Sequence, residues 1–192
     1  RKRLSAIYAP DILALLRPAP VPAAFDRLAH AAKRDHDVLA TLLLAPLAVT
    51  TGETRAVVRE ACVRLGFDRQ WRRALESRRW WIRADAARAL GAILDTQSVD
   101  PILALLGDDH EEVRAAAVDA LGSLEDPRAL PALTALLSTP SRHQRARVVE
   151  TIRRFGDAAV PALIDRAAVA PHDRVTVAEL LGLVRTTRRS EE

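Results

Sequence analysis

DPILALLGDDHEEVRAAAVDALGSLEDPRALPALTALL, residues 100–137, contains two kinds of segment that recur along the chain. One kind begins at a proline and continues with leucine and alanine, as in PILALL at 101–106 and PALTALL at 131–137. The other kind, RAAAVDALG at 114–122, ends in a glycine. Proline is tolerated in the first turn of a helix, and glycine is favoured just after a helix ends. The stretch therefore predicts a short helix, a longer helix and the start of another short helix.

The glycine-ended segment recurs without gaps. Its five copies are VREACVRLG (58–66), RADAARALG (83–91), RAAAVDALG (114–122), VVETIRRFG (148–156) and RVTVAELLG (174–182). The residue before the glycine is large and apolar in every copy, as in Leu65, Leu90 and Phe155. Small or apolar residues stand three and four positions before that residue, so the three columns share one helical face. We expect a long helix in each copy, with the glycine just past its C-terminal end.

A series of prolines marks the shorter helix of each repeat. Pro101, Pro131 and Pro161 are spaced by thirty residues, and Trp71 begins a related segment one period earlier. Proline inside a helix removes a hydrogen bond and bends the chain, so the short helices start or bend at these residues. Aromatic residues are only 4% of the chain, which favours closely packed helices over sheets. The predicted fold is all-α, an α-solenoid of antiparallel helix pairs.

Residues 67–185 resemble the short HEAT-like repeats that also occur in phycobilisome-lyase-type proteins, and the resemblance rests on the segment quoted first. Members of this family often carry an aspartate six residues before an arginine, and this pair bridges neighbouring repeats. Asp108 and Arg114 match the spacing, whereas Ser77 replaces the aspartate that would precede Arg83. The resemblance implies an α-α superhelix with an incomplete ladder of ion pairs.

The chain is expected to have three parts. Residues 1–34 form an irregular, proline-rich N-terminal cap, because prolines break two short helices there. Residues 35–185 form the HEAT-like solenoid of about five helix pairs, the first of them degenerate. Residues 186–192 form a polar tail. Atypical ends are expected because each repeat of a solenoid buries its apolar face only against its neighbours.

The densest group of charged and aromatic side chains lies between residues 69 and 88, where all three tryptophans occur. Arginines beside aromatic rings can grip phosphates and stack on bases, or contact an acidic protein surface. The alternative is that the tryptophans fill a gap between repeats while the arginines are solvated or paired with Glu76 and Asp85. The candidate binding residues are Arg69, Arg72, Arg73, Arg79, Trp80, Trp81, Arg83 and Arg88.

No catalytic residue, cofactor or metal site is predicted. HEAT-like alkylpurine DNA glycosylases use tryptophans and a catalytic aspartate in a basic channel, and Trp81 and Asp85 stand four residues apart. Surface charge explains Asp85 equally well. Phycobilin-lyase activity, the other enzymatic option within the resemblance, has no visible motif. His110, His143 and His172 are separated by about one repeat each, which is too far to share a metal ion.

The net charge of the chain does not determine the chemical class of its partner. The net charge is +4, with 29 basic and 25 acidic residues interspersed, which permits an anionic partner without requiring one. Only Lys2 and Lys33 are lysines, a bias typical of a GC-rich genome. The abundance of arginine therefore does not by itself indicate nucleic-acid binding.

We expect a non-catalytic protein-protein interaction or scaffold module that binds a protein partner on its concave or arginine- and tryptophan-rich surface. Two alternatives stay open: a nucleic-acid-binding HEAT-like protein, with or without glycosylase-like activity, and the cytoplasmic arm of a membrane-anchored protein flanked by Arg1-Lys2-Arg3. Cys62 is the only cysteine, and its aligned column of small and apolar residues indicates a core position. A single cysteine also fits a reducing compartment, so the expected location is cytoplasmic, with or without a membrane tether.

Overall fold

The computed structural model describes residues 2–15, 22–32, 34–48 and 53–189. In these residues every regular element is helical, with short 3₁₀ segments between α-helices. The α-helices are α1 (Lys2–Leu15), α2 (Pro22–Ala32), α3 (His36–Leu44), α4 (Glu53–Arg64), α5 (Phe67–Ala74), α6 (Trp80–Ala92), α7 (Val99–Ala104), α8 (Glu111–Leu124), α9 (Leu130–Ala135), α10 (Arg142–Arg154), α11 (Val160–Val169) and α12 (Arg174–Arg189). The predicted all-α solenoid is confirmed.

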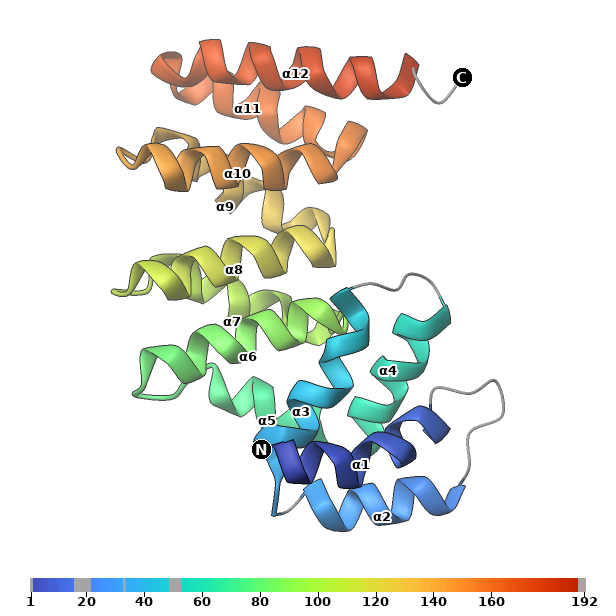
Figure 1. Cartoon of the computed structure of the whole chain (residues 1–192). Helices are drawn as coiled ribbons and strands as arrows, with labels where there is room; N and C mark the ends of the chain where they lie inside the picture. The colour runs from blue at the N-terminus through green and yellow to red at the C-terminus, as the bar shows by residue number, and fades with distance from the viewer. Residues whose placement is uncertain (1, 16–21, 33, 49–52, 190–192) are drawn as a thin grey trace.

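The long helices α6, α8, α10 and α12 form a ladder, in which they stack above one another in similar directions (Figure 1). The shorter helices α7, α9 and α11 lie behind the ladder in this view. Each short helix packs against the long helix that follows it, so the repeat is a helix pair. Among the contacts between neighbouring ladder helices, the one between α6 and α8 is the most extensive. The buried residues of these two helices are largely small, and they include Ala84, Ala87, Ala116, Ala117 and Ala120.

The prolines lie in the first turns of the short helices, as the sequence predicts. Pro101 is the third residue of α7, and Pro131 and Pro161 are the second residues of α9 and α11. The backbone N–H groups in the first turn of a helix have no hydrogen-bond acceptor within the helix. A proline at these positions therefore removes no helical hydrogen bond. A 3₁₀ turn leads into each helix, at Thr96–Ser98, Pro127–Ala129 and Gly156–Ala159.

The glycines have two different roles, and the prediction for three of them is wrong. Gly66 and Gly156 follow the ends of α4 and α10 with φ of +77° and +51°, as expected for residues that close a helix. Gly91, Gly122 and Gly182 instead lie inside α6, α8 and α12. The helices continue through these positions, so these glycines do not terminate them.

Close helix packing explains two of the internal glycines. A Cβ placed on Gly91 would lie 2.7 Å from the Cα of Ala120 in α8. A Cβ on Gly122 would lie 2.7 Å from the Cγ2 of Thr151 in α10. Both distances are shorter than any stable contact between carbon atoms. Glycine at these positions therefore lets consecutive ladder helices approach each other.

The arginines of the ladder helices establish the register of the repeats. Arg83, Arg114 and Arg145 follow one another at intervals of thirty-one residues. Each guanidinium donates to the backbone carbonyl six residues earlier, at 2.8, 2.7 and 3.1 Å respectively. The segment of α10 equivalent to 114–122 is therefore 145–153. The alignment on the final glycine instead matched 114–122 with 148–156, which is out of register by about one helical turn.

The N-terminal helices do not continue the ladder. α1 packs against α2 and α3, and Tyr8 on α1 donates a hydrogen bond to Asp35 before α3 (2.6 Å). Arg27 on α2 pairs with Asp11 on α1 (2.5 Å), and α1 continues through Pro10 as one helix. α4 packs against α5 and α3, and it stands to the side of α6 in Figure 1.

The expected boundaries of cap, solenoid and tail stay predictions. Residues 186–189 of the expected tail belong to α12.

Candidate interaction surface

Arg72 lies between α5 and the segment that follows α6. Its guanidinium donates to both carboxylate oxygens of Asp95 (3.0 and 2.8 Å) and to Asp68 one turn earlier (2.6 Å). These carboxylates have side chains that are only 11% and 7% exposed. A nearly buried carboxylate is strongly destabilising without a cationic partner. Arg72 therefore serves the fold and is not free to bind a phosphate.

Arg83 bridges two repeats. Its Nε and Nη2 donate to the two carboxylate oxygens of Asp108, both at 2.7 Å, and both side chains are mostly buried. The hydrogen bonds from Arg83 hold the pKa of Asp108 below its ordinary value. This is the aspartate–arginine bridge that the family resemblance implies, formed between Asp108 and the arginine of the preceding repeat. Arg114 donates only to backbone carbonyls, those of Asp108 and Asp109.

Two of the three tryptophans take part in packing. Trp71 is 6% exposed and stacks on Phe67, with ring centroids 5.4 Å apart. Trp80 is half-buried and stacks on His110, with centroids 5.7 Å apart and planes 15° from parallel. The first contact lies within α5, and the second joins α6 to the residue that precedes α8. The packing interpretation therefore applies to Trp71 and Trp80.

Trp81 is the exposed member of the cluster. It remains 48% exposed, meets Trp80 edge to face at 5.9 Å, and has the Arg79 guanidinium 5.8 Å from its ring centroid. Arg88 is also exposed and forms an ion pair with Asp85 three residues earlier (3.0 Å). The predicted residues that the structure leaves on the surface are Arg69, Arg73, Arg79, Trp81 and Arg88.

Trp81 lies at a groove between α3, α5 and α6, which we call the α3–α5–α6 groove. Its volume is about 900 Å³. Its apolar lining consists of Ala40, Leu44, Ala74 and Ala92, which are partly exposed, and of Ala86 and Ala89, which are buried. The partly exposed side chains can contact apolar groups of a ligand.

Polar residues of opposite charge also line the groove. Arg79, the residue before α6, and the Asp85–Arg88 pair of α6 lie on one side. α3 contributes His36 and Asp37, whose ring nitrogen and carboxylate are 3.4 Å apart. No sequence pattern joins α3 to the arginine–tryptophan cluster, because only the fold brings these helices together.

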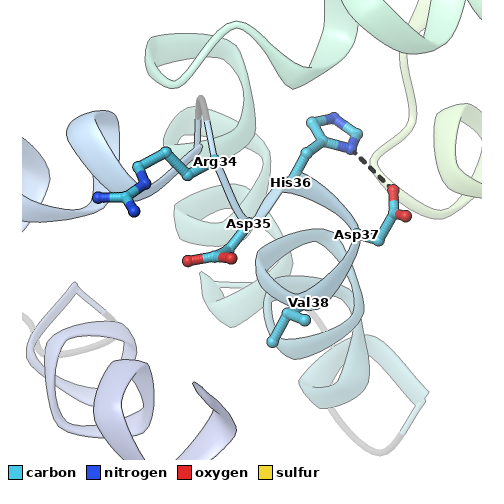
Figure 2. Close-up of a pocket in the computed structure, with 5 residues that line it drawn as sticks. All are labelled: Arg34, Asp35, His36, Asp37 and Val38. Carbon is cyan, nitrogen blue, oxygen red and sulfur yellow. Dashed lines mark hydrogen bonds and ion pairs between the residues drawn. The ribbon is translucent and has the colours of Figure 1, made fainter. Parts of the chain in front are cut away.

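A second hollow, of about 290 Å³, lies at the turn between α2 and α3. It is lined by the five consecutive residues from Arg34 to Val38, and Figure 2 shows their side chains pointing in different directions. Asp35 is already bound to Tyr8, and His36 is turned toward Asp37. Because these side chains do not converge on a common point, the hollow does not form a built site.

A polar cluster joins the last two repeats. The Oγ of Ser138 donates to Asp173 (2.7 Å), lies 2.9 Å from the Nε2 of His172 and accepts a hydrogen bond from Arg166. Burial raises the pKa of Asp173, but the hydrogen bonds from Ser138 and Arg166 outweigh burial and lower it. A carboxylate kept ionised in this way is a weak base. The cluster therefore links the last two repeats through side-chain hydrogen bonds.

The described residues contain no group of three or more histidine, cysteine or acidic side chains arranged to hold a metal ion. Among their helices, none combines the length and apolar character needed to cross a membrane.

The stacked helix pairs and the groove beside them define an α-solenoid protein. The profile of HEAT repeats matches residues 69–147 and again residues 99–183. The chain belongs to the HEAT-repeat family. It is also similar in fold to the crystal structure of an engineered protein from the Northeast Structural Genomics Consortium, with a TM-score of 0.53 and 17% identity, covering 96% of this chain and 88% of the other. No curated protein matches the chain.

Proposed function

We propose that the protein is a non-catalytic scaffold module that binds a protein partner in the α3–α5–α6 groove. HEAT repeats are generally protein-interaction scaffolds, which supports the class of function. The observation that carries the choice of surface is Trp81, a half-exposed tryptophan at an apolar groove. Tryptophan is enriched among the few residues that dominate binding energy at protein interfaces.

The amount of exposed surface supports a binding role. The chain exposes 11601 Å², whereas a compact monomer of the same mass would expose about 9,000 Å². An extended stack of repeats leaves more surface available per residue than a globule does. The excess is about 2,600 Å², which is more than the roughly 800 Å² that one partner contributes to a standard protein–protein interface.

Local ion pairs favour a protein over a nucleic acid as the partner. A phosphate backbone requires a surface of predominantly positive charge. The exposed side chains of α6, α8 and α10 instead alternate in sign and neutralise one another. Their ion pairs are Asp85–Arg88 at 3.0 Å, Asp119–Arg147 at 2.5 Å and Glu150–Arg153 at 2.9 Å.

Affinity capture with three forms of the full chain tests the proposal. The forms are the unmodified protein, Trp81→Ala, and Ile164→Ala as a control that removes a comparably exposed apolar side chain from α11. We expect partner proteins to be retained by the first and third forms and lost from Trp81→Ala. Equal retention by all three forms would contradict the assignment of the groove.

The nucleic-acid alternative has its own test. Arg72 is bound to two carboxylates, so the informative variant neutralises the exposed arginines Arg69, Arg73 and Arg79 together. Retention of the protein on immobilised DNA that falls steeply with salt and is abolished by this triple variant would favour the alternative. We expect weak retention that the variant changes little.

A further inference from the structure

Thr139 occupies the position at which the next bridging aspartate of the ladder would lie. It follows Asp108 by thirty-one residues, which is also the interval between the ladder arginines Arg83 and Arg114. The backbones match as well, since φ and ψ are −64° and 147° at Asp108 and −62° and 138° at Thr139. The N–H of each residue donates to the carbonyl three residues earlier, at 3.1 and 3.0 Å respectively. Asp108 and Thr139 are therefore equivalent residues of successive repeats.

Arg114 lacks the acidic partner that its equivalent, Arg83, has. Both guanidiniums donate through Nη1 to the backbone carbonyl six residues earlier. Arg83 uses Nε and Nη2 to bind both carboxylate oxygens of Asp108 in the next repeat. The same two nitrogens of Arg114 make no hydrogen bond and no ion pair with any described residue. The residue that corresponds to Asp108 for this arginine is Thr139, which carries no charge.

The hydroxyl group of Thr139 is too short to replace the carboxylate. Its oxygen is attached to Cβ, one atom closer to the backbone than the oxygens of an aspartate. It donates to Oε1 of Gln144 (3.2 Å), and no hydrogen bond joins it to Arg114. A phosphoryl group on this oxygen adds a phosphorus atom and three acceptor oxygens, which extends the side chain beyond the length of an aspartate. Phosphorylation would therefore give Thr139 the reach and the charge that Arg114 lacks in a partner.

The start of α10 provides a second reason to expect an anion at this place. The first turn of α8 contains Glu111 and Glu112, whereas the first turn of α10 contains no acidic residue. It contains Arg142 and His143, and neither forms an ion pair with a described residue. Positive charge at a helix N-terminus opposes the helix dipole, and negative charge there is stabilising. A phosphoryl group on Thr139, three residues before α10 begins, would offset this unfavourable charge.

We propose that Thr139 is a phosphorylation site and that Arg114 of the preceding repeat binds the phosphoryl group. A protein kinase supplies the group from a nucleoside triphosphate. The bond between Oγ1 and the γ-phosphorus forms while the bond from this phosphorus to the leaving nucleoside diphosphate breaks, and the hydroxyl proton passes to a base of the kinase. Thr139 is partly exposed and lies in a turn between two exposed residues, Ser138 and Pro140, so a kinase can reach it.

The phosphorylated chain has a second bridge between repeats, from α8 to the segment before α10. Hydrogen bonds from arginine to phosphate are charge-assisted and stronger than those between neutral groups. Phosphorylation therefore stabilises the junction of α8 and α10 in the way that the pair of Arg83 and Asp108 stabilises the junction before it. This inference is independent of the α3–α5–α6 groove and does not rest on the proposed function.

Two substitutions at Thr139 test the geometry. Thr139→Asp introduces the residue type found at position 108, and Thr139→Asn has the same shape without the charge. We expect the melting temperature of the full chain to be about 3 °C higher for Thr139→Asp than for Thr139→Asn. Adding Arg114→Gln to both variants should reduce this difference to about 1 °C, the part due to the helix dipole. A difference that is unchanged without Arg114 would overturn the bridge.

The phosphorylated protein tests the binding directly. The full chain is produced with phosphothreonine incorporated at position 139 through an expanded genetic code. We expect its melting temperature to rise by about 3–6 °C, and Arg114→Gln should remove most of the rise. A ³¹P NMR titration reports on the contact itself, because a neighbouring guanidinium lowers the pKa of the second phosphoryl ionisation below its ordinary value of about 6. A pKa that Arg114→Gln does not raise would contradict the binding, whatever the effect on stability.

Mass spectrometry of the protein isolated from its own cells tests whether the site is used. Trypsin cleaves after Arg128 and Arg142, so the informative peptide is 129–142. We expect a fraction of this peptide to carry phosphate on Thr139. The matched control is a strain with Thr139→Val, which keeps the shape of the side chain and removes the hydroxyl. Phosphate found on Ser138 or Ser141 instead, or absent from cells in both growing and stationary cultures, would overturn the proposal.

Discussion

Gly91 of α6 lies so close to Ala120 of α8 that a Cβ at Gly91 would be 2.7 Å from the Ala120 Cα. The obstacle is backbone, which cannot move aside as the end of a flexible side chain can. The most extensive contact of the ladder therefore depends on the absence of one methyl group. This relationship gives a direct test of the repeat packing.

Gly91→Ala should destabilise the fold by about 1–3 kcal/mol, because the added methyl group forces α6 and α8 apart. Alanine normally stabilises a helix relative to glycine, so local propensity predicts the opposite sign. Urea unfolding followed by circular dichroism measures the change. Gly107→Ala is the control, since nothing lies within 4 Å of a Cβ there and Gly107 has no positive φ. Equal behaviour of the two variants would refute the close contact.

Asp108→Asn should lower the melting temperature by several degrees, on the order of 3 °C or more, because it leaves the mostly buried Arg83 guanidinium without its carboxylate. Asp100→Asn is the matched control. Its carboxylate is 75% exposed and lies 3.3 Å from Arg128, so removing its charge should change the melting temperature little. Differential scanning calorimetry of both variants decides the matter. A larger shift for Asp100→Asn would count against the inter-repeat bridge.

The fold could be predicted because its signals are local. Pro101, Pro131 and Pro161 restrict the backbone at their own positions, and the structure places each in the first turn of a short helix. Glycine is ambiguous, because it closes helices by adopting positive φ and also permits close contact between them. Gly66 and Gly91 represent these two roles in similar sequence contexts, and only the neighbouring helix distinguishes them.

The candidate site could be predicted only in part, because burial and ion pairing depend on distant residues. Arg72 and Arg83 belong to the arginine cluster in sequence, but their partners Asp95 and Asp108 lie 23 and 25 residues away. The family resemblance pointed to Asp108 as a bridging residue, and no pattern pointed to Asp95. The groove was not predicted at all, since it results from the position of α3 relative to α6.

Cys62 should be unreactive in the folded protein. Its side chain is fully buried, and burial raises the pKa of the thiol to about 12. The thiolate is the reactive form, so at pH 8 both its population and its access to reagent are very low. Ellman's reagent should label Cys62 at least about 100-fold more slowly in buffer than in 6 M guanidinium chloride. Rapid labelling of the folded chain would contradict the core position.

Acid should destabilise the protein through three aspartates. Asp108 and Asp126 have lowered pKa values because Arg83 and Arg128 donate hydrogen bonds to them, and the pKa of Asp173 is lowered despite its burial. A folded-state pKa below the unfolded value means that the unfolded chain binds protons first as the pH falls. The resulting stabilisation is fully present above the unfolded value of about 4 and is lost as the pH falls through the folded values.

The expected result is a melting temperature that is constant near neutral pH and falls between about pH 5 and pH 2. Asp173→Asn tests the assignment to one group, because asparagine cannot titrate. This variant should be less stable than the unmodified protein at pH 7, since Arg166 loses its ionised partner. The difference between the two proteins should shrink as the pH is lowered toward 2, because the native aspartate is then protonated as well. A difference that stays constant across this range would show that Asp173 contributes through packing and not through its charge.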